Sequence, residues 1–280
     1  MGRKKITRYA FNEKNPIESR LKEVCRLFDL EAAAQSLERI NKISTSLKED
    51  HYQFFERLLD EELQRREDMR LDRWTKQAKF PWTKTILDYD FSYPEFVEKD
   101  KVLELAECKW IEHGGKVIFF GPPGVGKTHL SIALGIEAIQ KSYETKFFTV
   151  DRLTEAISVA VAKDQEQGGG KNRAKLLNSL TNVPLLVLDE LAYSTLTDDV
   201  KDFLFHIIHR RHDAQKSIIL TANESFEKWD KFFGDKARTS AAIDRLLDDC
   251  VPISIKGNSY RQLHFNSKIK SNEKINKKNK

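Results

Sequence analysis

The chain has 280 residues, of which 40% are hydrophobic and 32% charged, and a formal net charge of +5. This composition is typical of a globular protein and excludes a disordered chain, and the length allows one sizeable domain and a smaller one. Because no apolar run approaches the ~20 residues of a membrane span, and no apolar segment follows the basic N-terminal residues as it does in a secretory signal, we expect a cytoplasmic protein.

The N-terminal part of the chain is predicted to be helical. Residues 1–16 are polar and basic, and we expect a flexible arm there. Residues 17–78 contain no glycine or proline, and apolar residues recur at helical spacing, with an interruption at Ser44, Thr45 and Ser46. We therefore predict a small all-helical domain over residues 17–78. Its many charged side chains either contact DNA or a protein or simply face water.

A linker and one more helix are predicted next. Residues 79–95 are aromatic and irregular, which is typical of a linker that packs against the following domain. Residues 96–113 have helical periodicity, and Gly114 and Gly115 supply a C-cap.

The rest of the chain alternates between short apolar runs and helical segments. The apolar runs cover residues 116–121, 146–150, 183–190, 217–223 and 251–256. Such alternation predicts βαβ units, and hence an α/β domain over residues 96–266 with a parallel sheet and helices on both of its faces. The lysine-rich residues 267–280 are predicted to be a disordered tail.

A phosphate-binding motif follows the first of these strands. Gly121, Gly126, Lys127 and Thr128 match G-x-x-x-x-G-K-[ST] at a strand-to-helix junction. Glycines let the backbone approach a polyphosphate, the helix N-terminus favours an anion, Lys127 reaches the phosphates, and the Thr128 hydroxyl holds Mg²⁺. The predicted nucleotide-binding residues are Gly121, Pro122, Pro123, Gly124, Val125, Gly126, Lys127, Thr128 and His129.

Two later strands are predicted to complete this site. The run over residues 183–190 ends in Asp189, placed to bind Mg²⁺ together with Thr128, and in Glu190, placed to polarise an attacking water. The next strand ends at Asn223, whose amide contacts either the γ-phosphate or the lytic water, or else only forms a turn. We predict ATP and Mg²⁺ as ligands.

In this order and spacing, GPPGVGKTHL, LLVLDELAY, LTANESFEKWDKFF, AAIDRLLDD and IKGNSYR resemble the IstB proteins, the ATP-binding transposition helpers of IS21-type insertion sequences. The resemblance covers nearly the whole chain. It implies an AAA+ ATPase of the initiator group, related to the DnaC-type helicase loaders, with a five-stranded parallel sheet and no separate lid domain.

The resemblance also implies roles for further residues. Asn223 would be sensor 1, and Arg245 would be the arginine finger that reaches the γ-phosphate of a neighbouring subunit, with Arg238 as the second candidate. The alternative for Arg245 is an ion pair on the helix surface with Asp244 or Asp248. Arg261 is expected near the nucleotide or a subunit interface.

Residues 151–182 are expected to bind DNA. They form two predicted helices around a glycine-rich link, a region with which initiator-type relatives line a DNA channel, and they carry Lys163, Lys171, Arg173 and Lys175. Such cations neutralise phosphates without reading bases, so we expect binding that is non-specific in sequence. The alternative is an ordinary solvated helix face.

The function expected from these features is an ATPase that assembles on target DNA with ATP as a multi-subunit complex, recruits or stimulates a transposase, and disassembles on hydrolysis. The alternative within the same fold is a DnaC-like helicase loader. A small-molecule or nucleotide kinase is less favoured, because the Asp189–Glu190 pair and Asn223 point to water as acceptor, and no base-reading motif of a GTPase is found.

Overall fold

The computed structural model of the protein describes residues 16–191, 196–223, 229 and 236–262, with the backbone alone at 236–238. The predicted N-terminal arm, apart from Pro16, and the predicted tail over 267–280 lie outside these residues. The chain divides into two compact units, Met1–Asp72 and Arg73–Lys280. This boundary lies within a helix that ends at Ala78, whereas the sequence predicted that the helical domain extends to residue 78.

The first unit contains α1 (Ile17–Leu27), α2 (Glu31–Leu47) and the start of α3 (His51–Ala78). α1 ends because Asp29 takes a φ of 57°, and the N–H groups of Asp29 and Leu30 donate to the carbonyls of Arg26 (3.1 Å) and Cys25 (2.8 Å). This is a Schellman-type C-terminus with aspartate in the usual place of glycine. The sequence pattern did not predict a break at this point.

The break predicted at residues 44–46 occurs slightly later in the chain, because α2 continues through these residues, ends at Leu47, and is followed by α3 from His51. The hydroxyls of Thr45 and Ser46 donate to the carbonyls of Asn41 and Ile43, both at 2.7 Å. Hydroxyl groups that bond to the preceding turn in this way are tolerated inside a helix.

The core of this unit is small. Ala33, Leu37 and Ile40 of α2 pack against Leu58 of α3, with Cys25, Leu30 and Phe54 at its edge. Leu21 and Phe28 share the apolar periodicity of α1 but are 43% and 59% exposed.

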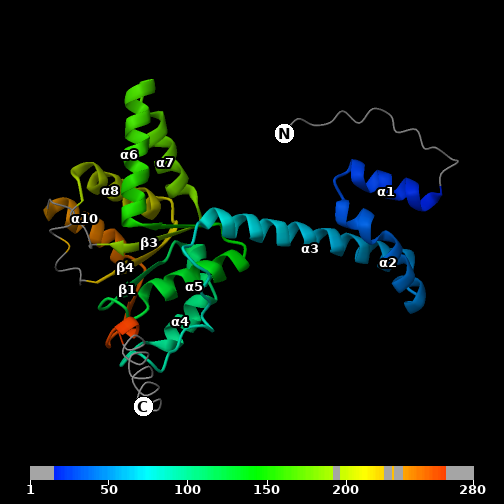
Figure 1. The fold of residues 1–280 in the computed structure, drawn as a ribbon, viewed down its shortest axis with the longest axis horizontal. Helices are drawn as coiled ribbons and strands as arrows, with labels where there is room; N and C mark the ends of the chain where they lie inside the picture. The colour runs from blue at the N-terminus through cyan, green and yellow to red at the C-terminus, as the bar shows by residue number, and fades with distance from the viewer. Residues whose placement is uncertain (1–15, 192–195, 224–228, 230–235, 263–280) are drawn as a thin grey trace, which may run out of the picture. The chain divides into compact units, whose positions relative to one another are not determined.

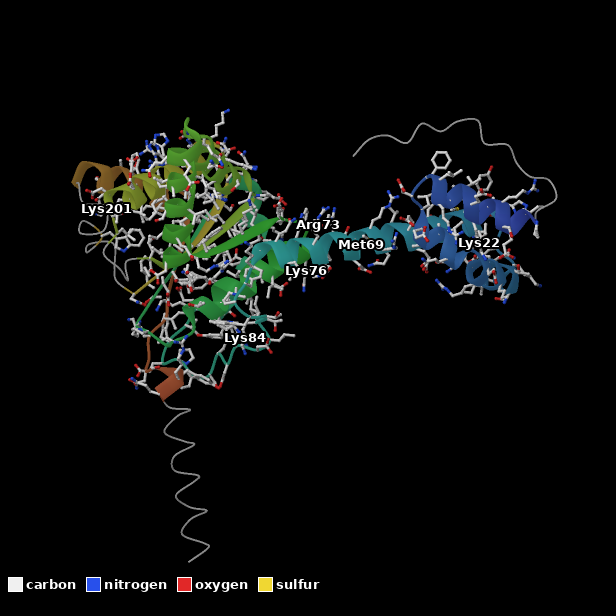
Figure 2. The ribbon with its side chains drawn as sticks, turned by 45° about the horizontal axis from the view of Figure 1, so that its top comes forward. Lys22, Met69, Arg73, Lys76, Lys84 and Lys201 are labelled. Carbon is white, nitrogen blue, oxygen red and sulfur yellow. The ribbon has the colours of Figure 1, made fainter. Side chains whose placement is uncertain are left out.

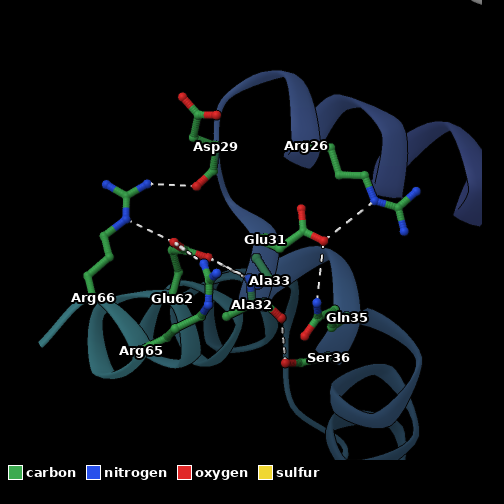
Figure 3. A network of polar contacts seen from close by, with 10 residues as sticks. All are labelled: Arg26, Asp29, Glu31, Ala32, Ala33, Gln35, Ser36, Glu62, Arg65 and Arg66. Carbon is green, nitrogen blue, oxygen red and sulfur yellow. Dashed lines mark hydrogen bonds and ion pairs between the residues drawn. The ribbon is translucent and has the colours of Figure 1, made fainter. Parts of the chain in front are cut away.

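A buried carboxylate joins α3 to the N-terminus of α2 (Figure 3). Glu62 Oε2 accepts the backbone N–H groups of Ala32 (2.8 Å) and Ala33 (3.4 Å), and Glu62 Oε1 accepts Arg66 Nε (2.8 Å). The Glu62 residue is 2% exposed. Because α2 has no side-chain N-cap of its own, Glu62 satisfies the first-turn donors from a different helix.

The later part of α3 carries outward-pointing charged and apolar side chains. Figure 2 labels Met69, Arg73 and Lys76 along it, and all three are exposed. This agrees with the mixed charges of this stretch, which predict a solvated helix face.

The second unit is built on a five-stranded sheet in the order β2-β3-β4-β1-β5, with every neighbouring pair parallel. The strands are β1 (Lys116–Phe120), β2 (Thr145–Thr149), β3 (Leu185–Leu191), β4 (Ser217–Ala222) and β5 (Cys250–Ser254). Each strand overlaps one of the five predicted apolar runs, so the predicted parallel α/β fold is confirmed.

Helices cover both faces of the sheet (Figure 1). One face carries α6 (Val150–Gln167), α7 (Lys171–Asn182), α8 (Asp198–Asp213) and α10 (Lys236–Leu247), and the other carries α4 (Lys99–Ala106) and α5 (Lys127–Gln140). Along β1, Ile118 packs under the first group of helices, whereas Val117 and Phe119 pack under the second. Burial on both faces explains why the strands are continuous apolar runs.

The helix predicted over residues 96–113 is wrong in extent. α4 ends at Ala106, Cys108 takes a left-handed φ of 61°, and a 3-10 helix, η1 (Lys109–His113), follows. Trp110 Nε1 donates to the carbonyl of Leu105 (2.8 Å). A helical periodicity count does not detect this local hydrogen bond of Trp110 or the left-handed conformation of Cys108.

Candidate active site

The loop between β1 and α5 is shaped to admit an anion. Gly124 and Gly126 have φ angles of 82° and 100°, which side-chain-bearing residues rarely adopt. A Cβ on Gly124 would lie 2.2 Å from Ser259 Oγ, and one on Gly126 would lie 2.5 Å from Tyr89 Cε2. α5 starts at the end of this loop without a side-chain N-cap. The N–H groups of its first turn are therefore suited to a phosphate.

Lys127, the first residue of α5, is a buried cation. It is 7% exposed, and its Nζ donates to the carbonyls of Gly121 (2.7 Å) and Pro122 (2.9 Å). Burial lowers the pKa of Lys127 to about 8, against the opposing effect of Asp189 and Glu190. A phosphate in the loop would give this ammonium group an anionic partner in place of two neutral carbonyls.

Asp189, near the end of β3, accepts hydrogen bonds from two threonines. Thr128 Oγ1 lies 2.9 and 3.0 Å from the two carboxylate oxygens, and Thr221 Oγ1 lies 2.6 Å from Oδ1. Burial raises the pKa of Asp189, while the two hydroxyl donors and Lys127 oppose the rise. A carboxylate paired with a hydroxyl of the phosphate-loop helix is an oxygen donor set that suits Mg²⁺.

Glu190 follows Asp189, and its exposed side chain lines the same cavity as Lys127 and Thr128. Burial and the neighbouring charges of Asp189 and Asp151 raise the pKa of Glu190, and Arg261 and Lys127 oppose this rise. A carboxylate with a raised pKa at the edge of a cavity is suited to accept a proton from water.

These groups border a cavity of about 380 Å³, a size typical of small-molecule sites. Residues 123–129 line it from the loop and α5, and Glu190, Thr221 and Asn223 line it from the ends of β3 and β4. The structure thus brings together the predicted Lys127, Thr128, Glu190 and Asn223, with Asp189 bonded to Thr128 behind them. Gly121 and Pro122 lie just before this stretch and hold Lys127 through their carbonyls.

The linker, residues 79–95, supplies one wall of the cavity. Trp82, Lys84 (labelled in Figure 2), Tyr89 and Tyr93 are among its lining residues. Tyr89 Oη donates to the carbonyl of Val125 (3.0 Å), and its ring meets His129 edge to face, with ring centroids 5.2 Å apart. Burial raises the pKa of Tyr89 to about 12. The sequence predicted that the linker packs against the following domain, but it identified no linker residue as part of the site. The aromatic character of Trp82, Tyr89 and Tyr93 was the only available signal.

The segment after β5 supplies another part of the wall. The N–H of Tyr260 donates to the carbonyl of Gly124 (3.0 Å), and Tyr93 Oη donates to the carbonyl of Asn258 (3.1 Å). Arg261 lines the cavity beside these contacts. This placement brings a cation of the C-terminal segment to the cavity. The resemblance implies a position of Arg261 near the nucleotide or at a subunit interface, and that expectation stays a prediction.

Arg245, in contrast, does not line the cavity. It lies on α10, where Nη1 donates to the carbonyl of Ala241 (2.9 Å) and Nη2 lies 3.4 Å from His209 Nε2. Within the described part of the chain no carboxylate pairs with Arg245. Asp248, one of its two expected partners, instead contacts His212 (3.1 Å) and Lys116 (3.8 Å). The side chain of Arg238 lies outside the described residues.

The predicted DNA-contacting residues lie on the helical hairpin formed by α6 and α7, which run side by side (Figure 1). Its turn is fixed by Asp164, which accepts the N–H groups of Asn172 (2.8 Å) and Arg173 (2.9 Å). Arg173 lies 3.8 Å from Asp199 and 3.7 Å from Asp202, so its charge is partly balanced within the fold. The remaining predicted cations, here called the hairpin lysines, are exposed. They are Lys163, Lys171 and Lys175.

Over its described residues the chain has no helix that is both long and apolar enough to cross a membrane.

A family model described as IstB-like ATP binding protein matches residues 24–268. A protein of Geobacillus stearothermophilus, described as an insertion sequence IS5376 putative ATP-binding protein, is 33% identical over 245 residues, which cover 88% of this chain and 94% of that protein. A Pseudomonas aeruginosa protein, described as an insertion sequence IS21 putative ATP-binding protein, is 35% identical over 203 residues, covering 72% and 74%.

Among solved structures, the replication initiator DnaA bound to AMPPCP and single-stranded DNA matches with a TM-score of 0.52 and 21% identity, over 69% of this chain and 56% of that chain. At this level of identity the likeness concerns the fold.

Proposed function

The chain belongs to the family of IstB-like ATP binding proteins, and from this premise we propose that it is an ATPase that assembles with ATP on target DNA and recruits or stimulates a transposase. The named relatives are ATP-binding proteins of insertion sequences. ATP binding in association with an insertion sequence is therefore the general function of this chain. Hydrolysis, DNA binding and the transposase are the specific parts of the proposal.

One observation carries the ATPase proposal. A buried lysine, a hydroxyl of the first turn of α5, a buried carboxylate and a second, accessible carboxylate meet at one end of a cavity behind a glycine loop. Three features of this site fit a polyphosphate. The loop has no space for Cβ atoms at Gly124 and Gly126, and the N-terminus of α5 has no side-chain cap. Among the described residues, the ammonium group of Lys127 bonds only to carbonyls. The Thr128–Asp189 pair fits Mg²⁺, which supplies charge neutralisation of the phosphates when bound.

The residues then divide the work of hydrolysis. Lys127 and the N–H groups of residues 124–128 hold the phosphates, and Thr128 with Asp189 would hold the metal ion. Glu190 accepts a proton from the attacking water as it approaches the γ-phosphorus, and Asn223 orients that water or the γ-phosphate. The phosphoryl group passes to water, which yields ADP and inorganic phosphate.

Arg245 is proposed to act on the site of a neighbouring subunit. It is the arginine of the motif that resembles the family's arginine finger, and its position on α10, away from the cavity of its own chain, favours action in trans. ATP between subunits would then couple occupancy to assembly, and hydrolysis would release the assembly.

DNA is proposed to lie against the helical hairpin. The hairpin lysines are exposed on α6 and α7, and Asp164 fixes the turn between these two helices. Point charges of this kind neutralise phosphates without reading base edges, so binding should weaken with salt and depend little on sequence.

The first test measures ATP hydrolysis with and without duplex DNA for the wild-type protein and for Glu190→Gln. We expect DNA to stimulate wild-type hydrolysis. The variant keeps the size of the side chain but accepts no proton, so it should bind ATP and DNA normally and lose about 10²-fold or more in turnover.

Two results would contradict the proposal. If the wild-type protein binds ATP but never hydrolyses it, the assigned chemistry is wrong. If hydrolysis is indifferent to DNA over a range of salt concentrations, DNA-dependent assembly is wrong. Capture of a purified transposase rather than a replicative helicase by the ATP-bound Glu190→Gln protein distinguishes the transposition helper from a helicase loader.

A further inference from the structure

The end of β3 is irregular where it meets β4. The register pairs Leu188 with Leu220 and Leu191 with Ala222. Asp189 and Glu190 therefore face Thr221 alone, which is a β-bulge. Glu190 takes a φ of 65°, a left-handed conformation that is uncommon for a residue other than glycine, asparagine or aspartate. A bulge also removes a regular hydrogen bond between the strands, so the backbone N–H of the extra residue needs another acceptor.

The hydroxyl of Thr221 is placed to do so. Thr221 Oγ1 accepts the backbone N–H of Glu190 (2.9 Å) and donates to Asp189 Oδ1 (2.6 Å). Thr221 is fully buried. A hydroxyl has a single proton to donate, and here that proton goes to Asp189 while a lone pair receives Glu190. Both bulged residues are thus tied to one side chain of the neighbouring strand.

We propose that Thr221 is a positioning residue for ATP hydrolysis: its hydroxyl holds the bulge and thereby directs the Glu190 carboxylate into the cavity and orients the Asp189 carboxylate toward Thr128. Thr221 stands on β4, the strand between β1, which leads into the phosphate loop, and β3, which carries the two carboxylates. The proposal rests on the proposed ATPase function and adds to it a residue that the phosphate-site motifs do not contain.

The hydroxyl, rather than the bulk of Thr221, is what the proposal requires. Serine keeps the hydroxyl and loses a methyl group, whereas valine keeps the shape and loses both hydrogen bonds. Thr145, the first residue of β2, offers a matched control, because it is also fully buried in the sheet and does not line the cavity. Its hydroxyl donates to the carbonyl of Tyr143 (3.2 Å). Thr145→Val therefore reproduces the loss of a buried hydroxyl without touching the bulge.

The direct test follows backbone amide exchange at Glu190 by NMR in the nucleotide-free full-length protein. We expect this amide to exchange about tenfold or more faster in Thr221→Val than in the wild type, and near the wild-type rate in Thr221→Ser, because only the valine removes its acceptor. Thr145→Val should leave it unchanged. Equal protection of Glu190 in Thr221→Val and wild type would overturn the proposal.

The functional test separates turnover from binding. Thr221→Val should lower kcat by roughly 10²-fold, the scale for a misplaced catalytic group, while the ATP dissociation constant stays within about threefold of wild type. Thr221→Ser should restore most of kcat, and Thr145→Val should retain it. A kcat that falls equally in Thr145→Val and Thr221→Val would show that only general stability was lost, which refutes a positioning role.

The two proposals fail in different ways. If the wild-type protein proves not to hydrolyse ATP, the proposed function fails, yet the exchange experiment still decides whether Thr221 holds the bulge. If the wild type hydrolyses ATP and Thr221→Val does so at the same rate, the function stands and the role of Thr221 is refuted.

Discussion

Replacing Glu62 by alanine tests whether the N-terminal helices are held by the buried network of Figure 3. The Glu62 carboxylate is 3% exposed and bonds to two N–H groups of α2 and to Arg66 Nε. Arg66 in turn donates to the carbonyl of Asp29 (3.0 Å). Removal of the carboxylate leaves the first donors of α2 buried without an acceptor.

The magnitude follows from these contacts. Loss of an N-terminal cap costs about 0.5–2 kcal/mol, and a buried donor left without a partner costs about 1–3 kcal/mol. Because these contributions overlap, we expect Glu62→Ala to lower the unfolding free energy of the first unit by about 2–4 kcal/mol. Glu61→Ala is the matched control on the same helix. Its carboxylate is 38% exposed and pairs with Arg39 at 2.7 Å, so the loss should be about 0–1 kcal/mol.

The same network predicts a dependence on pH. Burial pushes the pKa of Glu62 upward, but Arg66 and the N–H groups of Ala32 and Ala33 outweigh it, and the net pKa lies below its ordinary value of 4.5. A carboxyl group whose pKa is lowered by folding stabilises the protein above its unfolded pKa. This contribution is lost as the pH falls below 4.5 and through the lowered pKa of the folded state. The part of the acid sensitivity that Glu62 contributes should disappear in Glu62→Ala.

The assay is hydrogen exchange of α2 amides in the full-length protein, because it reports opening of these helices apart from the second unit. Protection in α2 should fall strongly in Glu62→Ala and stay nearly unchanged in Glu61→Ala. Equal losses in the two variants would refute the reasoning, because exposed and buried carboxylates would then contribute alike.

Three further predictions concern the second unit. Lys127→Ala should weaken ATP binding by about 10–100-fold, since it removes a charge-assisted phosphate contact, and it should not lower the thermal stability of the nucleotide-free protein. Calorimetric titration measures the affinity, and melting curves measure the stability. Undiminished affinity contradicts the phosphate-site assignment. Changing the hairpin lysines together to glutamine should reduce the slope of log K against log salt for duplex DNA by up to about 2.7, whereas Lys101→Gln on α4, the opposite face of the sheet, should not change it. Arg245→Ala and Glu190→Gln should each be inactive alone, but mixing them should restore part of the hydrolysis, because some sites between unlike subunits then contain both an intact Glu190 and an intact Arg245. No recovery in assembled mixtures argues against action in trans.

Local sequence patterns were sufficient for the second unit's framework. Five apolar runs became five parallel strands, since strands buried on both faces must be apolar throughout. The glycine pattern identified the loop, because positive φ angles and the close approach of Ser259 and Tyr89 exclude side chains at Gly124 and Gly126.

Helix ends were predicted less well. The serine and threonine residues at 44–46 did not interrupt α2, because their hydroxyls bond to the preceding turn. α1 instead ended at an aspartate in the left-handed conformation. Neither outcome follows from apolar periodicity, since both depend on where individual hydrogen bonds are made.

The sequence by itself determined which segments become strands and where the phosphate loop lies, because backbone dihedrals and side-chain alternation are properties of neighbouring residues. The phosphate-site motifs predicted that Thr128 and Asp189 meet, but only the tertiary structure decided which other distant groups do. Thr128 and Asp189 are 61 positions apart, Glu190 and Thr221 are 31 apart, and Tyr93 and Asn258 are 165 apart. The order of the strands in the sheet brings the first two pairs together and places β4 between β1 and β3, and an isolated bridge between Phe96 and Lys256 lies beside the third pair. A hydroxyl on β4 therefore comes to hold the backbone of a carboxylate on β3, a relation that no local pattern encodes.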